Sequence, residues 1–397
     1  MNDIELGNSA NEGEKEKETM IMFQSDYLEG AHEAVLRRLS ETNLVQQVGY
    51  GEDEYCTHAR GLIRGQVGDQ AADVEFLAGG TQTNLTVISA LLKPFEGVIS
   101  ADTGHIAVHE TGAIEATGHK VLTVPNQDGK LTAEQVDAMM QAHEADETKE
   151  HTVRPGAVYI SFATELGTLY SKSELKALSK VCRKHGLYLF MDGARLGYGL
   201  MSEKNDLNMA DIYRCTDVFY IGGTKQGALL GEAVVFRNHA LHEDFRYFIK
   251  QKGGMMAKGR ILGIQFEALF EERKKTAEEE SVQAQAAPDK KEKRGKKKKA
   301  DAADCLYFEL AAHADRLAMK LRSGLLELGF PFEQESFTNQ QFPILPDKIL
   351  KKLAKKYSYS FSRHVDDAHS AVRFCTSWAT KEESVDALLK DLRKLMQ

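Results

Sequence analysis

Apolar residues in this chain gather in short runs that alternate with amphipathic segments. The apolar runs predict strands over residues 74–77, 97–100, 120–124, 157–162, 187–191 and 218–221. Between them, segments such as 133–143 and 172–185 carry apolar residues at the spacing of a helix. Short buried strands separated by helices are typical of a mostly parallel sheet that helices cover on both faces. The pattern therefore predicts an α/β fold.

The second half of the chain changes character. A glycine-rich turn over 222–231 predicts a hairpin-like return into a further strand at 233–236. Helical spacing resumes at about Phe245, and 306–329 predicts a long helix. The run 371–375 predicts an edge strand.

Composition shifts along the chain suggest where the domains lie. Residues 1–19 are acidic and poor in apolar side chains, so we expect a disordered tail. We expect a large domain over 20–250, whose first residues also contact a smaller domain over 251–397. The smaller domain carries a polar, Lys-rich insert at 271–303, which is predicted to be disordered or a solvated helix extension.

Composition excludes several protein classes. The chain has 397 residues, 42% of them hydrophobic, with only 7 Pro, which excludes collagen-like and broadly disordered chains. No apolar run reaches the roughly 18 residues of a membrane helix, and the first residues lack the apolar core of a secretory signal. Five widely spaced cysteines, none in a CxxC pair, argue against disulfides and structural zinc. We therefore expect a cytoplasmic protein without a metal site.

The net charge of −8 hides one strongly basic segment. Residues 288–299 hold eight Lys or Arg and two acidic side chains, so the rest of the chain carries −14. Such a run could bind nucleic-acid phosphates, but it lacks the aromatic residues that stack on bases. A nucleic-acid-binding or scaffolding role is thus an alternative of a different class, and the acidic body argues against it.

Two loops follow predicted strands, where open α/β sheets bind ligands. The segment 79–84, GGTQTN, joins a strand to a helix, so its glycines and free N–H groups suit an anion. The same segment is equally consistent with a capped turn that binds no ligand. Asp192 ends the most hydrophobic strand, and a buried carboxylate there needs a cation or hydrogen-bond donors. It could instead cap the next helix.

Two further residues carry basic side chains at the same kind of position. Lys225 lies among glycines after a buried strand, where desolvation would lower its pKa and make its amine a Schiff-base nucleophile. His105 follows another strand and could present its imidazole face to a ligand, or serve the structure alone. The order of loop, histidine, aspartate and lysine indicates more than each residue does singly.

Several segments resemble one known family in the same order. MDGARLGYGL resembles the DGAR motif of threonine aldolases and related β-eliminating lyases. YIGGTKQGALLGEAVVF resembles the lysine segment of the bacterial low-specificity L-threonine aldolases. FQSDYLEGAHEAVL, FLAGGTQTNLTVISALL, TGHIAVHETGAIEATGHKV, SFATELGTLYSKSEL and AVRFCTSWATKEESVDAL fit as well. The similarity runs from about residue 22 to the C-terminus, except for 271–303.

This resemblance implies pyridoxal 5′-phosphate (PLP) enzymes of fold type I, the aspartate aminotransferase type. It implies that Lys225 holds PLP as an imine, that Asp192 pairs with the pyridine nitrogen and that His105 stacks on the ring. Further contacts to the cofactor are implied for residues that match the family's phosphate loop and its neighbours: Gly80, Thr81, Thr224 and Arg195, with Lys258 reaching the phosphate from a neighbouring subunit.

The same resemblance implies how a substrate is held and cleaved. Ser25, Arg195 and Arg373 match residues near the substrate carboxylate, and His151 takes the place of a second histidine near its hydroxyl. The expected reaction splits L-threonine or L-allo-threonine into glycine and acetaldehyde. Its base would be His105, His151 or a bound water.

Two questions stay open at this stage. A related PLP lyase could eliminate the β-substituent of Ser, Cys, Tyr or Trp, and the DGAR and GGTKQG segments alone do not exclude it. The family's sites lie at a dimer interface, so the resemblance implies a homodimer or homotetramer and a small amino-acid substrate. It implies no membrane partner.

Overall fold

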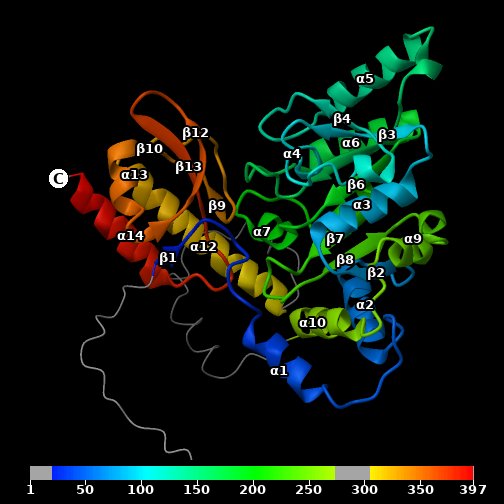
Figure 1. Cartoon of the computed structure of the whole chain (residues 1–397), viewed down its shortest axis with the longest axis horizontal. Coiled ribbons are helices and arrows are strands. Elements are labelled where there is room, and N and C mark those ends of the chain that lie inside the picture. The colour runs from blue at the N-terminus through cyan, green and yellow to red at the C-terminus, as the bar shows by residue number, and fades with distance from the viewer. Residues whose placement is uncertain (1–19, 273–304, 397) are drawn as a thin grey trace, which may run out of the picture.

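The computed structural model describes residues 20–272 and 305–396, and a seven-stranded sheet forms the centre of its larger part (Figure 1). The strands lie in the order β2-β8-β7-β6-β5-β3-β4. Their bounds are β2 Asp73–Leu77, β3 Glu96–Ala101, β4 Val121–Val124, β5 Arg154–Ser161, β6 Tyr188–Asp192, β7 Val218–Gly222 and β8 Glu232–Phe236. The predicted α/β class and all of these strands are confirmed, with ends that differ by a few residues.

One strand of this sheet runs against the others. β8 pairs antiparallel with both β7 and β2, whereas the neighbouring pairs from β7 to β4 are parallel. The first residue of β8, Glu232, therefore lies at the edge of the sheet where the other six strands end. Glu232 is in register with Leu77 on one side and Gly222 on the other.

Alternate residues of each strand enter two separate cores. On β7, Val218 and Tyr220 face one cluster of buried side chains, and Phe219 and Ile221 face the other. A strand buried on both faces needs apolar residues at every position, which explains the continuous apolar runs in the sequence.

Helices cover both faces of the large sheet (Figure 1). α3 and α9 contribute to the core on one face, and α2, α5, α6, α8 and α10 to the core on the other. Local sequence fixes where they begin and end: Ser171 and Glu174 form a capping box at the start of α6, and Gly186 ends it with a positive φ. The bounds are α1 Glu33–Glu41, α2 Glu54–Val67, α3 Gly80–Leu91, α4 His105–Val108, α5 Ala133–Ala145, α6 Lys172–His185, α7 Leu196–Met201, α8 Met209–Cys215, α9 Phe245–Gln251 and α10 Arg260–Phe270.

A smaller sheet follows, with its own apolar core. Its helices are α12 Leu306–Glu327, α13 Asp347–Leu353 and α14 Glu382–Leu395, and its strands are β9 Gln340–Gln341, β10 Ile344–Pro346, β12 Ser360–His364 and β13 His369–Cys375. The long helix expected over 306–329 is confirmed. The N-terminal strand β1 Ile21–Met22 pairs with β11 Tyr357–Ser358, so the start of the described chain lies against its last part.

The edge strand predicted at 371–375 is wrong in one respect. β13 is central in the small sheet, because it pairs antiparallel with β10 on one side and β12 on the other. Val372 and Phe374 enter the core between this sheet and its helices.

Some expectations fall outside the described residues. These are the acidic tail 1–19, almost all of the insert 271–303 and the whole basic run 288–299. The division of the chain near residue 250 stays a prediction. In the parts that the structure describes, we find no helix that is both long and apolar enough to cross a membrane.

Candidate active site

A cavity of about 330 Å³ opens at the edge where the six like-directed strands of the large sheet end. The turns after β2, β3, β6 and β7 all reach it, as open α/β sheets place their ligand sites. Its lining includes side chains or backbone of these residues: Tyr27, Gly79, Gly80, Thr81, His105, Ser161, Glu165, Asp192, Arg195, Thr224, Lys225 and Glu232.

Asp192, the last residue of β6, is buried in this cavity. Its Oδ2 accepts hydrogen bonds from Tyr159 Oη at 2.6 Å and Asn84 Nδ2 at 3.1 Å, and its Oδ1 accepts from the Ala194 amide at 2.9 Å. Burial works to raise the pKa of Asp192, but these donors outweigh it and hold the pKa below its ordinary value. Asp192 is therefore a fixed buried anion.

Gly193 lets the chain turn directly after this aspartate. A Cβ at residue 193 would lie 1.8 Å from the carbonyl oxygen of Tyr220 on β7. No side chain fits there unless backbone moves, so only glycine allows β6 and β7 to approach this closely behind Asp192.

Lys225 lies on the turn after β7, and its amine is enclosed in the cavity. Its Nζ lies 5.9 Å from the centre of the Tyr27 ring. Burial is the largest effect on the pKa of Lys225, and the nearby Arg195 adds repulsion, so the pKa falls below its ordinary value. A lysine with a lowered pKa is a better nucleophile near neutral pH.

His105, at the start of α4, is linked to Asp192 by a short chain of hydrogen bonds. Its Nδ1 lies 2.7 Å from Glu110 Oε1, which also accepts from Asn84 Nδ2 at 2.7 Å. Asn84 bonds Asp192 as well, so all four side chains are held together. Burial works to lower the pKa of His105, but the Glu110 hydrogen bond and the Asp192 charge raise it above its ordinary value.

A second cluster, around Arg195 and Arg373, includes buried polar atoms that lack a hydrogen-bond partner in the part of the chain that the structure describes. Arg195 donates from Nε and Nη2 to the two oxygens of Asp26, at 2.8 and 3.0 Å. Arg373 donates to Gln340 Oε1 at 3.1 Å and to the Gln24 carbonyl at 3.2 Å. Within the described residues, the buried Ser25 Oγ and Arg373 Nε have no hydrogen-bond partner. Unpaired buried donors of this kind suit an anionic ligand.

With this geometry in place, the comparisons with known proteins can be weighed. Residues 23–328 match the family model described as beta-eliminating lyase.

The chain belongs to the β-eliminating lyase family.

Two curated relatives in this family are both described as low specificity L-threonine aldolase. The protein from Pseudomonas sp. (strain NCIMB 10558) is 29% identical over 391 residues, covering 94% of this chain and 97% of the relative. The Pseudomonas aeruginosa protein is 28% identical, with the same coverage of both chains.

Solved structures agree with this placement. A threonine aldolase from Leishmania major is 42% identical, with a TM-score of 0.84, and the match covers 95% of this chain and all of that one. An aspartate aminotransferase from Thermus thermophilus is 15% identical with a TM-score of 0.64, covering 96% of this chain and 93% of that one. The second likeness shows the fold alone: the predicted PLP fold type I is confirmed.

Most residues that the sequence singled out for a β-eliminating lyase site meet in this one cavity. His105, Asp192, Arg195, Thr224 and Lys225 line it together with the start of α3 at Gly80 and Thr81. Ser25 and Arg373 lie in the adjoining cluster around Asp26 and Gln24. Their individual roles stay predictions.

His151 is not brought to this cavity. It ends a short 3₁₀ helix, Lys149–His151, just before β5, and its side chain is exposed. The cavity lies at the other end of β5, and an eight-residue strand spans more than about 20 Å. Within one chain, His151 therefore does not serve as the base, contrary to the prediction.

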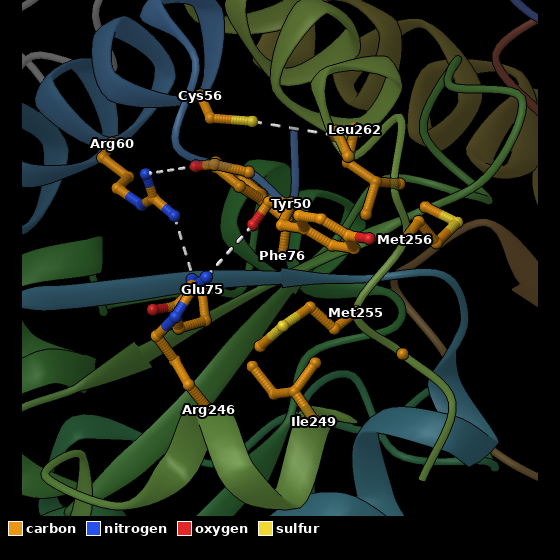
Figure 2. A pocket seen from close by; sticks show the side chains of 13 residues that line it. Tyr50, Cys56, Arg60, Glu75, Phe76, Arg246, Ile249, Met255, Met256 and Leu262 are labelled. Carbon is orange, nitrogen blue, oxygen red and sulfur yellow. Dashed lines mark hydrogen bonds and ion pairs between the residues drawn. The ribbon is translucent and has the colours of Figure 1, made fainter. Parts of the chain in front are cut away.

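Lys258 also lies outside the cavity, on an exposed loop that leads into α10. The loop packs over a small second pocket, where Arg60 of α2 and Arg246 of α9 both pair with the buried Glu75 (Figure 2). Gly259 lies tightly against the backbone of Gly51 on the facing loop. This placement leaves Lys258 free to meet a neighbouring subunit, and the predicted phosphate contact stays a prediction.

Sequence patterns did not reveal several groups in and around this cavity. His109 follows His105 by one helical turn, with ring centres 5.5 Å apart. Burial and the charges of His105 and Arg373 lower the pKa of His109. Its spacing of four residues from His105 was a signal that could have been used. Asp26, Glu110 and Glu232 gave weaker signals, because each has its partner far along the chain or across a turn.

Proposed function

We propose that this chain is a PLP-dependent aldolase that cleaves L-threonine and L-allo-threonine into glycine and acetaldehyde. One observation carries the proposal: a lysine with a lowered pKa and a fixed carboxylate share one cavity, beside unpaired donors that suit a substrate carboxylate. Membership of the β-eliminating lyase family and the threonine aldolase names of its relatives support it.

The residues present fit PLP. Asp192 would pair with the pyridine nitrogen, because it is an anion that already has its other hydrogen bonds. The free N–H groups at the start of α3, Gly80 and Thr81, would hold the phosphate. Lys225 would form the covalent link, and His105 would lie against the ring. When bound, PLP supplies an electron sink for the pair of electrons left on the substrate's α-carbon.

The protein's own part begins with the substrate carboxylate. Ser25 Oγ and the unpaired Nε of Arg373 would take it up, with Arg195 close by, and a guanidinium donates hydrogen bonds to a carboxylate along fixed directions. Asp26 holds Arg195 in place by accepting hydrogen bonds from its Nε and Nη2. Fixing the carboxylate fixes the direction of the Cα–Cβ bond, which decides which bond breaks.

A base must then remove the proton of the β-hydroxyl. We assign this role to His109, because its lowered pKa keeps the imidazole neutral near pH 7 and two cationic side chains lie nearby. His105, with its raised pKa and its bond to Glu110, suits the ring-stacking role better. As the proton leaves, the Cα–Cβ bond breaks, acetaldehyde departs and the α-carbon takes up a proton to give glycine.

Oligomeric state and cellular location belong to the same proposal. We expect a homodimer or homotetramer, with Lys258 reaching the cofactor phosphate of the neighbouring subunit. None of the five cysteines, all of which lie in the described residues, forms a disulfide, and all five are buried, which supports a reducing compartment such as the cytoplasm.

The binding half of this proposal has a direct test. Purified protein incubated with PLP should gain a visible absorbance band, and borohydride followed by peptide mass spectrometry should place the added mass on Lys225. A label on another lysine, or no band at all, would refute the site. Lys180→Ala, at an exposed position on α6, is the matched control, and it should keep the label on Lys225.

A further inference from the structure

One carboxyl group of the cavity has no part in the proposed reaction. Glu232 begins β8, is 3% exposed and lines the cavity beside Lys225. Its Oε1 accepts a hydrogen bond from Thr224 Oγ1 at 2.9 Å, and its Oε2 accepts from the Gly223 amide at 3.2 Å. A buried acid therefore binds the turn that carries the lysine.

This arrangement commits the Thr224 hydroxyl. The hydroxyl has one proton to donate, and Glu232 receives it. Its oxygen accepts from the Gly231 amide at 3.1 Å. While Glu232 is charged, Thr224 has no proton left for an anion in the cavity, and the carboxylate would also repel that anion. The predicted contact from Thr224 to a phosphate thus conflicts with a charged Glu232.

We propose that Glu232 is a positioning residue that must carry a proton while an anionic ligand occupies the cavity, and that the protonated acid turns the Thr224 hydroxyl toward that ligand. One proton passes from solvent to a Glu232 oxygen. The new Glu232 O–H donates to Thr224 Oγ1, and the Thr224 O–H donates to the ligand. In taking the anion to be a cofactor phosphate, the inference rests on the proposed function.

The groups around Glu232 decide where it titrates. Burial has the largest effect, and with the charge of Asp192 it raises the pKa of Glu232 to about 8. The Thr224 hydrogen bond and the cationic Lys225 act in the opposite direction. Tyr220 of β7 and Tyr307 of α12 also face Glu232, and burial keeps both phenols neutral. Glu232 is protonated below its pKa, so anion affinity should be high there and fall as pH rises above it.

The test uses sulfate as the probe, because sulfate keeps its charge throughout the pH range of the experiment. Full-length Lys225→Ala protein removes the titration of the lysine, and Lys225→Ala/Glu232→Gln is its matched partner. Sulfate affinity is measured by calorimetry from about pH 7 to about pH 10. We expect the single variant to lose about tenfold in affinity per pH unit above the Glu232 pKa, and the double variant to show a flat profile.

Variants at Thr224 separate this role from a merely structural one. In the same Lys225→Ala background, Thr224→Ser keeps a hydroxyl and should keep the slope. Thr224→Val should bind sulfate more weakly and with a smaller slope, because only the direct repulsion by charged Glu232 remains.

Measurements in buffers with different ionisation enthalpies provide a readout that needs no change at Glu232. Lys225→Ala protein should take up protons with sulfate at pH values above its Glu232 pKa, which the loss of the Lys225 cation raises, and none well below it. No proton uptake, or an unchanged slope in the Glu232→Gln partner, would overturn the inference. Failure of the proposed function shows separately, as wild-type protein with PLP that forms no glycine from threonine.

Discussion

Glu110 Oε1 lies 2.7 Å from His105 Nδ1. It also accepts a hydrogen bond from the side-chain amide of Asn84, which donates to Asp192 as well. The carboxylate fixes which ring nitrogen of His105 points into the helix turn, so the other nitrogen and the ring face are left for the cavity. Glu110 and Asn84, which the sequence analysis did not name as site residues, therefore position His105 and Asp192, which it did name.

Glu110→Gln tests this link. The variant keeps the size of the side chain and removes its charge, so the pKa of His105 should fall. The shift is measured by NMR titration of the His105 ring. Glu115→Gln, at an exposed position on the same segment, is the control and should leave the His105 pKa unchanged. An unshifted His105 in Glu110→Gln would contradict the assignment.

His109→Gln tests the proposed base. Loss of a general base costs typically 10²- to 10⁴-fold in kcat, whereas threonine binding should change little because the carboxylate donors remain. The lowered pKa of His109 also predicts that wild-type activity persists through the pH range where an ordinary histidine becomes protonated, and is lost only at lower pH. Steady-state kinetics across pH measure both effects. His364→Ala, an exposed histidine on β12, should behave as wild type, and a His109→Gln protein with wild-type kcat would assign the base elsewhere.

The lowered pKa of Asp26 predicts that the fold loses stability in acid. Burial works to raise its pKa, but Arg195, Lys225 and two hydrogen-bond donors hold the pKa at about 2, below the ordinary 3.8. A group with a lowered pKa stabilises the fold above its ordinary pKa, and that stability is lost as pH falls toward the lowered value. Between pH 4 and pH 2, the free energy of unfolding should therefore drop by about 2 kcal/mol on account of Asp26.

Asp26→Asn gives the comparison. It leaves Arg195 buried without its anion, so the protein should be less stable by about 3–5 kcal/mol at pH 7 and lose less between pH 4 and pH 2. Denaturant unfolding at several pH values measures both quantities. The exposed Asp367→Asn should match wild type throughout. Equal acid sensitivity in wild type and Asp26→Asn would show that Asp26 is not the responsible group.

The sequence predicted the large sheet well for a physical reason. Strands buried on both faces need apolar side chains at every position, so β5, β6 and β7 stand out as unbroken runs. β13 was harder, because Arg373 interrupts its apolar run and bonds Gln340 and the Gln24 carbonyl instead of entering the core. The residues of a short strand do not themselves show whether the strand pairs on one side or on both.

The site residues also differ in how well the sequence predicted them. Asp192 and Lys225 follow apolar strands directly, so position alone marked them as ligand contacts. The roles of Asn84 and Glu110 depend on partners 108 and 26 residues away along the chain. His151 precedes β5, so the same rule places it at the opposite edge of the sheet, and its predicted role rested on the resemblance alone.

The most direct test of the account is product analysis with L-threonine. Wild-type protein supplied with PLP should form glycine and acetaldehyde in equal amounts, and Lys225→Ala should form neither while remaining folded. Both threonine diastereomers should be assayed, with L-serine as a substrate for elimination. Formation of 2-oxobutyrate and ammonia from threonine in place of glycine, or glycine formation that survives in Lys225→Ala, would contradict the proposed aldolase.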